Sequence, residues 1–118
     1  MNQTNSIQFL IDKFIASKQR NEWLYNEYMK VYVRKSLRFI DRERVEAFDV
    51  ANVVVKPEYQ GLGYFKEMII HAEGLGLVVY VESINNPNLK AMLIKNGYTM
   101  DSSGYNAYKK PIYYLKSS

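Results

Sequence analysis

Cysteine is missing from this sequence of 118 residues, and histidine occurs only once, as His71. The absence of cysteine excludes disulfides, zinc fingers and thiol nucleophiles. A single histidine leaves little basis for the common histidine-based metal sites and catalytic triads. We therefore expect no metal site, and the chemistry of the chain must use other groups.

Long apolar segments are missing as well. The longest uncharged apolar stretch, residues 74–81, is far shorter than the roughly 20 residues that a membrane helix needs. The first fifteen residues are mostly polar and lack the pattern of a secretory signal peptide. These absences predict a cytoplasmic protein without a membrane partner.

The composition that remains suits one compact domain, which we expect to span residues 1–118. Apolar residues make up 47% of the chain and aromatic residues 14%, which is enough to fill one core. The net charge of +4 favours acidic ligands. An anionic cofactor satisfies that preference as well as a nucleic acid does.

The first half of the chain predicts one helix followed by strands. Apolar residues near the amino terminus follow the i, i+3, i+4, i+7 spacing of a helix, which we place at residues 6–19. β-Branched and aromatic residues predict strands at 28–40 and 45–55, whereas the aromatic segment 22–28 is ambiguous. The valine run 53–55 is of the kind expected where both faces of a strand are covered.

The second half alternates helices and strands. Pro57 ends the preceding strand because it has no N–H to donate, and glycines end both later helices. The expected order is a helix at 63–73, a strand at 77–83, a helix at 86–96, and closing strands at 98–100 and 112–115 separated by a flexible stretch at 101–111.

This order predicts an α/β fold. Long antiparallel strands followed by a β-α-β unit imply a mixed, mostly antiparallel sheet with a central parallel pair, flanked by helices. In open sheets of this kind ligands bind outside the carboxyl ends of the central strands. The interpretation therefore directs attention to residues 53–65 and 82–86.

A glycine turn lies between the first of those strands and its helix. Gly61 and Gly63 allow the backbone to approach a ligand closely, and the helix that follows presents first-turn N–H groups without intrahelical partners. Such a helix N-terminus binds phosphate oxygens. On the glycines alone, a tight connection between strand and helix is the favoured explanation of the pattern.

The surrounding segment VKPEYQGLG resembles the acetyl-CoA signature of the GCN5-related N-acetyltransferase (GNAT) superfamily. In that signature a Gln or Arg is followed at the fourth position by Gly and at the sixth by Gly or Ala. Gln60 and Gly63 match the first and fourth positions, and Gly61 is the usual second residue. Phe65 departs from the small sixth residue, which puts cofactor affinity in question rather than the fold.

A second segment supports the same resemblance. Asn86 stands eleven residues before the pair Gly97 and Tyr98, and Lys95 precedes the glycine by two, as is common in that superfamily. The resemblance covers residues 45–116. It implies the following division of the chain: an acceptor-side helix and hairpin at 1–44, an acetyl-CoA-binding core at 45–98, and closing strands at 98–118.

The resemblance implies acetyl-CoA as the acetyl donor. The backbone N–H of Val55 would polarise the acetyl carbonyl, as an oxyanion donor does. Asn86 would contact the cofactor arm, although an Asn before a Pro is equally a helix N-cap. The implied cofactor-binding residues are Val53, Val55, Gln60, Gly61, Leu62, Gly63, Tyr64, Phe65 and Asn86.

The implied reaction is direct attack of a neutral amine on the thioester, for which a proton acceptor is useful. Asp49 is the first candidate base, because on a regular strand it shares a face with Val53 and Val55. Glu82 is the second. For both, a solvated or capping role is an equal alternative.

A general acid for the departing thiolate is harder to assign. Many GNAT enzymes use a tyrosine in the helix after the Asn, and the matching residue here is Leu93. Another hydroxyl, from Tyr98, Tyr105 or Tyr108, could serve instead, or the low pKa of the thiol could make an acid unnecessary. Tyr98 is therefore included among the catalytic candidates.

The acceptor is a primary amine that the sequence does not identify, such as a protein lysine, an N-terminus or a small polyamine. The alternative function is a catalytically degenerate GNAT-fold module that docks an acidic protein or a nucleic acid through a basic hairpin around residues 34–44. Tyrosine side chains could stack on a single strand of nucleic acid, although a solvated hairpin is the simpler interpretation. Trp23, Tyr25 and Tyr28 could line a substrate mouth, but aromatic residues at this spacing are more often core residues, and we interpret them so. The chain is expected to be a monomer or homodimer.

Overall fold

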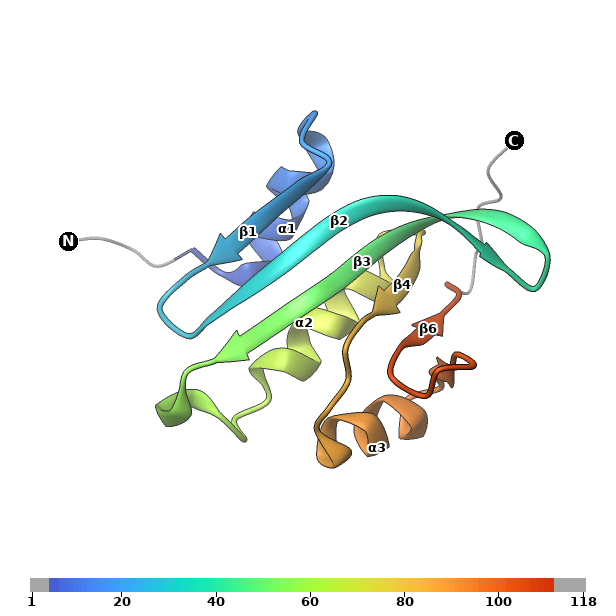
Figure 1. Ribbon diagram of the computed structural model, residues 1–118. Coiled ribbons are helices and arrows are strands. Elements are labelled where there is room, and N and C mark those ends of the chain that lie inside the picture. Colours follow the sequence, from blue (N-terminus) through green and yellow to red (C-terminus); the bar gives the residue numbers. More distant parts are fainter. Residues whose placement is uncertain (1–4, 112–118) are drawn as a thin grey trace.

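The computed structural model describes residues 5–111, which form one six-stranded sheet and three α-helices (Figure 1). The strand order across the sheet is β1-β2-β3-β4-β6-β5. The elements in chain order are α1 (Ile7–Ala16), β1 (Asn21–Tyr25), β2 (Met29–Ile40), β3 (Glu43–Val55), the 3-10 turn η1 (Pro57–Tyr59), α2 (Tyr64–Glu73), β4 (Val78–Val81), α3 (Pro87–Lys95), β5 (Thr99–Met100) and β6 (Ala107–Lys109).

The predicted fold class is confirmed. β3 and β4 are parallel and are connected through α2, whereas all other neighbouring strands are antiparallel. The sheet is therefore mixed and mostly antiparallel, with its parallel pair near the centre. The ambiguous segment near residue 22 is the edge strand β1, paired with β2 from Asn21↔Arg34 to Tyr25↔Lys30.

Helix α1 begins where the sequence predicts and ends earlier. The side chain of Ser6 caps the helix by accepting a hydrogen bond from the N–H of Phe9 at 3.0 Å. At the other end, both the N–H and the hydroxyl of Ser17 donate to the carbonyl of Phe14. This local competition for the last carbonyls ends the helix at Ala16 and makes the predicted end at residue 19 wrong.

The closing region also differs from the prediction. Residues 101–111, expected to be flexible, contain β6, which pairs with β4 on one side and β5 on the other. Asp101 accepts hydrogen bonds that hold the intervening turn, from Tyr80 at 3.0 Å and from Asn106 at 2.8 Å. The strand predicted at 112–115 lies outside the described residues.

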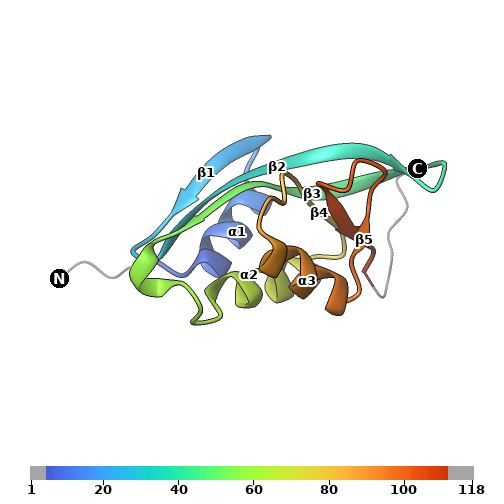
Figure 2. The same ribbon diagram turned by 60° about the horizontal axis from the view of Figure 1, so that its bottom comes forward.

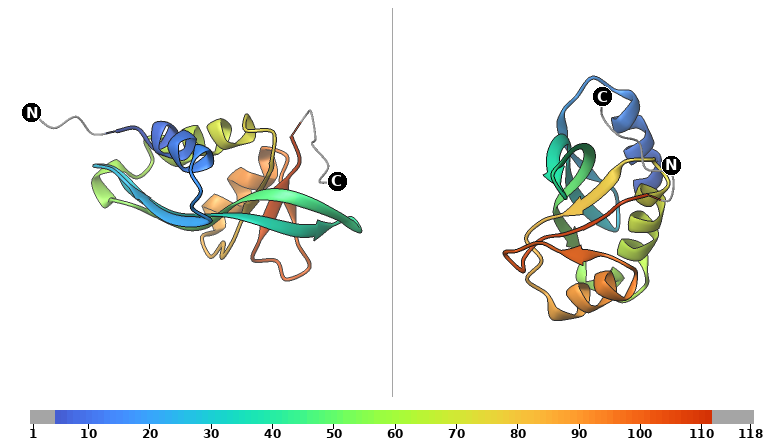
Figure 3. Two further views of the ribbon diagram at one scale, coloured as in Figure 1. Left: turned by 90° about the horizontal axis from the view of Figure 1, so that it is seen from above. Right: turned by 90° about the vertical axis from the view of Figure 1, so that its right-hand side faces the viewer.

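All three helices lie on the same side of the sheet (Figure 2). Their apolar faces meet the sheet in one core, to which α1 contributes Phe14, α2 contributes Met68 and α3 contributes Leu93. The opposite face holds only a small cluster around Val45 and Tyr80. Seen from above, the β2–β3 hairpin extends beyond the helices (Figure 3).

An irregularity in β3 decides which residues face the helices. Tyr32 of β2 pairs with Asn52, but its neighbour Val33 pairs with Val50, so Ala51 is an extra residue in β3. A bulge of this kind reverses the alternation of side chains along the strand. Val53 consequently packs against the same core as Val50.

Two expectations about β3 fail for this reason. Asp49 does not share a face with Val53 and Val55, because the bulge lies between them. The valine run is not covered on both faces either, since the side chain of Val54 is 47% exposed on the side without helices.

Burial along α2 gives a direct test of this packing. Met68 is fully buried, whereas Ile70 on the same helix is 57% exposed. We expect Met68→Ala to lower the free energy of unfolding by about 2–5 kcal/mol, because it leaves a cavity. Ile70→Ala should change it by less than about 0.5 kcal/mol. Urea unfolding measures both, and equal effects would contradict the described face of α2.

Candidate cofactor-binding site

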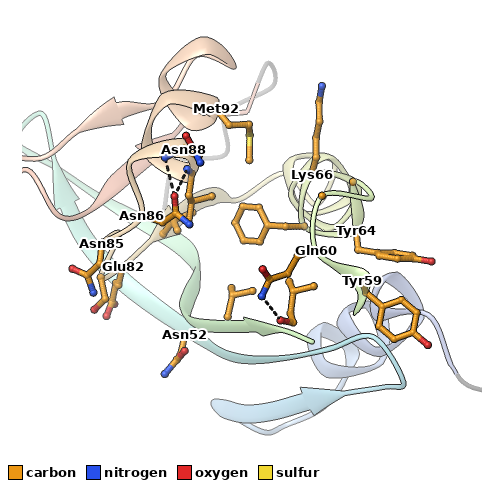
Figure 4. Close-up of a pocket in the computed structure, with 18 of the residues that line it drawn as sticks. Asn52, Tyr59, Gln60, Tyr64, Lys66, Glu82, Asn85, Asn86, Asn88 and Met92 are labelled. Atoms are coloured by element: carbon orange, nitrogen blue, oxygen red, sulfur yellow. Dashed lines mark hydrogen bonds between the residues drawn. The ribbon is translucent and has the colours of Figure 1, made fainter. Parts of the chain in front are cut away.

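A cleft of about 760 Å³ opens where β3 and β4 separate (Figure 4). The parallel pairing ends at Val50↔Val81, followed by one further hydrogen bond from the N–H of Glu82 to the carbonyl of Val50 at 3.0 Å. Beyond it β3 continues to Val55, while the chain after β4 turns away through Ser83, whose φ is 58°. The cleft thus lies at the carboxyl ends of the central strands, where the sequence predicted it.

Backbone donors of β3 line one wall of this cleft. The N–H of Lys56 donates to the carbonyl of Tyr28 at 3.0 Å, so residue 56 is turned toward β2. Since N–H groups alternate in direction along a strand, those of Val53 and Val55 point away from β2. They face the space that β4 has left, so an extended ligand arm could pair with them.

The glycine turn forms the next part of the wall. Gly61 and Gly63 have φ values of 78° and 90°, in the left-handed region that favours glycine. Gly63 caps α2 without any side-chain hydrogen bond, so first-turn N–H groups of the helix remain available. A Cβ at either glycine would meet nothing within 4 Å. The turn therefore presents donors to open space, as binding of an anion requires.

Gln60 lines the cleft and also supports the turn. Its Nε2 donates to the carbonyl of Val55 at 3.0 Å, which ties the turn to the end of β3 (Figure 4). Phe65, the departure from the signature, packs against the core while also lining the cleft. Its ring is thereby part of the wall and leaves the glycine turn open.

An aromatic cluster beside the turn was not anticipated. The ring of Tyr28 stacks on Tyr64 with centroids 4.5 Å apart, and Tyr59 meets Tyr28 edge-on at 4.7 Å. Tyr59 and Tyr64 both line the cleft. The five-residue spacing of these two tyrosines around the glycines was a signal that could have found them.

Asn86 lies on the opposite wall, at the start of α3 (Figure 4). Its Oδ1 accepts hydrogen bonds from the N–H groups of Asn88 at 2.8 Å and Leu89 at 3.3 Å. It therefore acts as the N-cap of α3, the alternative that the sequence had left open. Asn86 also lines the cleft, so the predicted contact with a cofactor stays a prediction.

Asp49 lies outside the cleft, on the face of the sheet without helices. Its side chain is 1% exposed, and both oxygens are engaged. Oδ1 accepts from Ser36 at 2.8 Å and Arg38 at 3.0 Å, while Oδ2 accepts from Arg38 at 2.9 Å. The Nε of Arg34 lies 3.5 Å from Oδ2. These contacts make Asp49 the centre of a buried ion-pair network.

Glu82 connects that network to the cleft. It lines the cleft, and its Oε1 pairs with the guanidinium groups of Arg34 and Arg38. Burial lowers the pKa of Arg38, but the hydrogen bond to Asp49 and the negative charges of Asp49 and Glu82 together outweigh burial, so the pKa is raised. The structure therefore brings only the second of the two candidate carboxylates to the cleft.

The tyrosines considered as general acids lie elsewhere among the described residues. Tyr98 is buried, its hydroxyl donates to Glu73 at 2.9 Å, and burial raises its pKa far above the ordinary value. Tyr108 stacks on Tyr80 on the other face of the sheet, and Tyr105 is exposed. Leu93 is fully buried, so a tyrosine at that position would also point into the core.

Within residues 5–111, no group of three or more His, Asp and Glu side chains could hold a metal ion. No helix in that part of the chain is long and apolar enough to cross a membrane.

Comparison with known proteins identifies the fold. No protein-family model and no curated protein matches this chain. Solved structures do match. The toxin AtaT, in its Y144F form with the antitoxin AtaR and acetyl-CoA, is 12% identical, with a TM-score of 0.55, and the match covers 70% of this chain and 58% of AtaT. AtaT complexed with acetyl-methionyl-tRNAfMet is 10% identical, with a TM-score of 0.56, and the match covers 62% of that AtaT chain.

Two further matches are to proteins other than AtaT. A GNAT-family acetyltransferase from Listeria monocytogenes is 22% identical over 70% of this chain and 57% of its own, with a TM-score of 0.53. The Bacillus subtilis N-acetyltransferase YlbP, solved with coenzyme A, is 13% identical over 89% of this chain and 78% of its own, with a TM-score of 0.57. The chain thus spans less than two thirds of AtaT and of the Listeria protein. These matches show a divergent GNAT fold.

The network around Asp49 predicts a large effect on stability. Asp49→Asn removes the buried charge that Arg34 and Arg38 neutralise, and we expect it to lower the free energy of unfolding by about 3 kcal/mol. Asp41→Asn breaks the exposed pair with Lys110 and should cost at most about 1 kcal/mol. Urea unfolding compares the two variants, and a stable Asp49→Asn protein would contradict the structural role.

Proposed function

We propose that this chain, which has the fold of the GCN5-related N-acetyltransferases, binds acetyl-CoA in the cleft between β3 and β4 and transfers the acetyl group to a primary amine. One observation carries the proposal. The two strands separate where the N–H groups of Val53 and Val55 point into the opening, directly before the glycine turn at the start of α2. Along the chain, the backbone thus offers N–H donors first for the extended arm of the cofactor and then for its pyrophosphate.

The cofactor residues divide by the chemistry they offer. The N–H groups of Val53 and Val55 would hold the arm and polarise the acetyl carbonyl. The turn from Gly61 through Leu62 and Gly63, with the first N–H groups of α2 at Tyr64 and Phe65, would hold the pyrophosphate. Gln60 would position the turn, and Asn86 would form the opposite wall.

Glu82 is the proton acceptor that we propose. An amine must be neutral when its nitrogen attacks the thioester carbon, and the proton that it loses has to leave as the carbon–sulfur bond breaks. Glu82 is the candidate carboxylate that lines the cleft, whereas Asp49 is enclosed by Ser36 and Arg38. Tyr98 would serve as a structural partner of Glu73.

The acceptor remains one of several amines: a protein lysine, an N-terminus or a polyamine. The complex of AtaT with acetyl-methionyl-tRNAfMet adds the amine of an aminoacyl-tRNA to the acceptors worth testing. The second candidate function is a binding module without catalysis. It is favoured by the burial of Leu93 and by the placement of Tyr98 away from the cleft.

Cofactor binding is tested by calorimetry with acetyl-CoA and two matched glycine variants. Gly63→Glu places a side chain and a negative charge against the pyrophosphate and should abolish binding. Gly104→Glu is the control, because Gly104 has φ 78°, equally open space and a position in the β5–β6 turn. Loss of binding in both variants, or in neither, would show that the glycine turn is not the site.

Catalysis is tested by thiol release with a panel of amines. Glu82→Gln should lower kcat/KM about 100-fold or more, as loss of a general base does, while leaving the affinity for acetyl-CoA unchanged. Acetyl-CoA binding by the unaltered chain without any turnover would support the binding module instead. If the variant is as active as the original, Glu82 is not the base.

A further inference from the structure

One face of the sheet carries no helix (Figure 2). Large apolar residues of β1 and β3 are exposed there, among them Trp23, Tyr25 and Val54. The strand register places them in two adjacent rows across β1, β2 and β3. One row is Trp23↔Tyr32↔Asn52, and the other is Tyr25↔Lys30↔Val54. We call these six residues the open-face array. Trp23 is 41% exposed and Tyr25 is 67% exposed, which overturns their interpretation as core residues.

The alternation of the strands accounts for this exposure. Leu24 and Val31, the neighbours of the array in β1 and β2, are buried against the helices. Side chains on either side of them must therefore point the other way. The bulge at Ala51 turns Asn52 outward beside Tyr32. The two array members in β3, Asn52 and Val54, thus owe their outward direction to the bulge.

Positive charge accompanies the aromatic rings. The Nζ of Lys30 lies 4.9 Å above the ring of Trp23, and Trp23 meets Tyr32 with centroids 5.1 Å apart. The next row of the same face holds Arg34, which is 36% exposed.

Acidic groups near the array are neutralised or face elsewhere. Asp49 is buried among its arginines, and Glu82 pairs with two of them. Glu22 directly precedes Trp23 in β1 and alternates with it, so it shares the side of Leu24.

We infer that the open-face array binds single-stranded nucleic acid, with bases stacked on Trp23 and Tyr32 and a phosphate paired with Lys30. Flat sheet faces that carry aromatic rings beside cations are suited to this ligand, because every base has a ring face and every linkage a negative charge. The centres of protein interfaces are depleted of lysine, whereas Lys30 lies in the middle of the array. The net charge of +4 acts in the same direction.

The array lies next to the cleft, but binding to one does not depend on binding to the other. Asn52 belongs to both, so a strand lying on the array would run toward the cleft. Binding to the array uses no group of the glycine turn. The inference can therefore fail while the acetyl-CoA site stands, and the reverse.

The only tryptophan in the chain is Trp23, so its fluorescence reports on the array directly. We expect an oligouridine of about ten nucleotides, within the usual site size, to quench this fluorescence in a saturable manner at about 50 mM salt. In a plot of log K against the logarithm of the salt concentration, each phosphate contact that is lost should make the slope less steep by about 0.7. Lys30→Gln should show that reduction, whereas Lys13→Gln on α1 should not.

Ring stacking is tested by fluorescence anisotropy of a labelled oligouridine. Trp23→Ala should weaken binding at least about 5-fold, in keeping with the loss of one base–aromatic stack. Phe9→Ala is the matched control, since Phe9 is an aromatic residue on α1 that is 53% exposed. Circular dichroism establishes that both variants are folded.

Three outcomes would overturn the inference. The first is the absence of quenching and of an anisotropy change at about 50 mM salt, where electrostatic binding is strong. The second is equal competition by polyglutamate, which would indicate an unselective cationic surface. The third is a change in tryptophan fluorescence with protein concentration alone, accompanied by dimer formation in sedimentation, which would assign the array to a second copy of the chain.

Discussion

The extra residue at Ala51 in β3 is the constraint on which the cleft and both faces of the sheet depend. Before it, Phe48 and Val50 face the helices and Asp49 faces away. After it, Val53 and Val55 face the helices, while their N–H groups point into the space that β4 has left. A regular strand would have turned a different set of N–H groups toward the cleft and exposed a different set of side chains. The bulge thus divides one strand into a half that pairs with β4 and a half that lines the cleft.

The network around Asp49 explains why the structural half tolerates a buried carboxylate. Arg34 and Arg38 come from β2 and neutralise it across the strand pair, while Glu82 from the end of β4 joins the same guanidinium groups. This connection fixes the position of Glu82 at the edge of the cleft. A carboxylate held by two cations is a stable feature of the cleft wall, and thiol-release measurements on its amide variant decide whether it also accepts protons.

Much of the fold was predictable because its signals are local. Strand content, helical periodicity and the stops at Pro57, Gly74 and Gly97 located the helices and the long strands within a few residues. The end of α1 was misplaced because Ser17 competes for its last carbonyls. Strand β6 was missed because its three residues carry no pattern of their own and are defined by pairing with β4 and β5.

The site shows the same difference between features with local sequence signals, which were predictable, and features that depend on distant contacts, which were not. A strand, a proline, a glycine turn and a helix are consecutive in the chain, so residues 57–64 alone predicted a glycine turn with free N–H groups at the start of α2. Which face a residue occupies depends instead on register with a distant strand. That register placed Asp49 among arginines and Trp23 in the open, and the packing of α2 placed Glu73 against Tyr98. These outcomes follow from contacts between residues far apart in sequence, so only the folded chain could decide them.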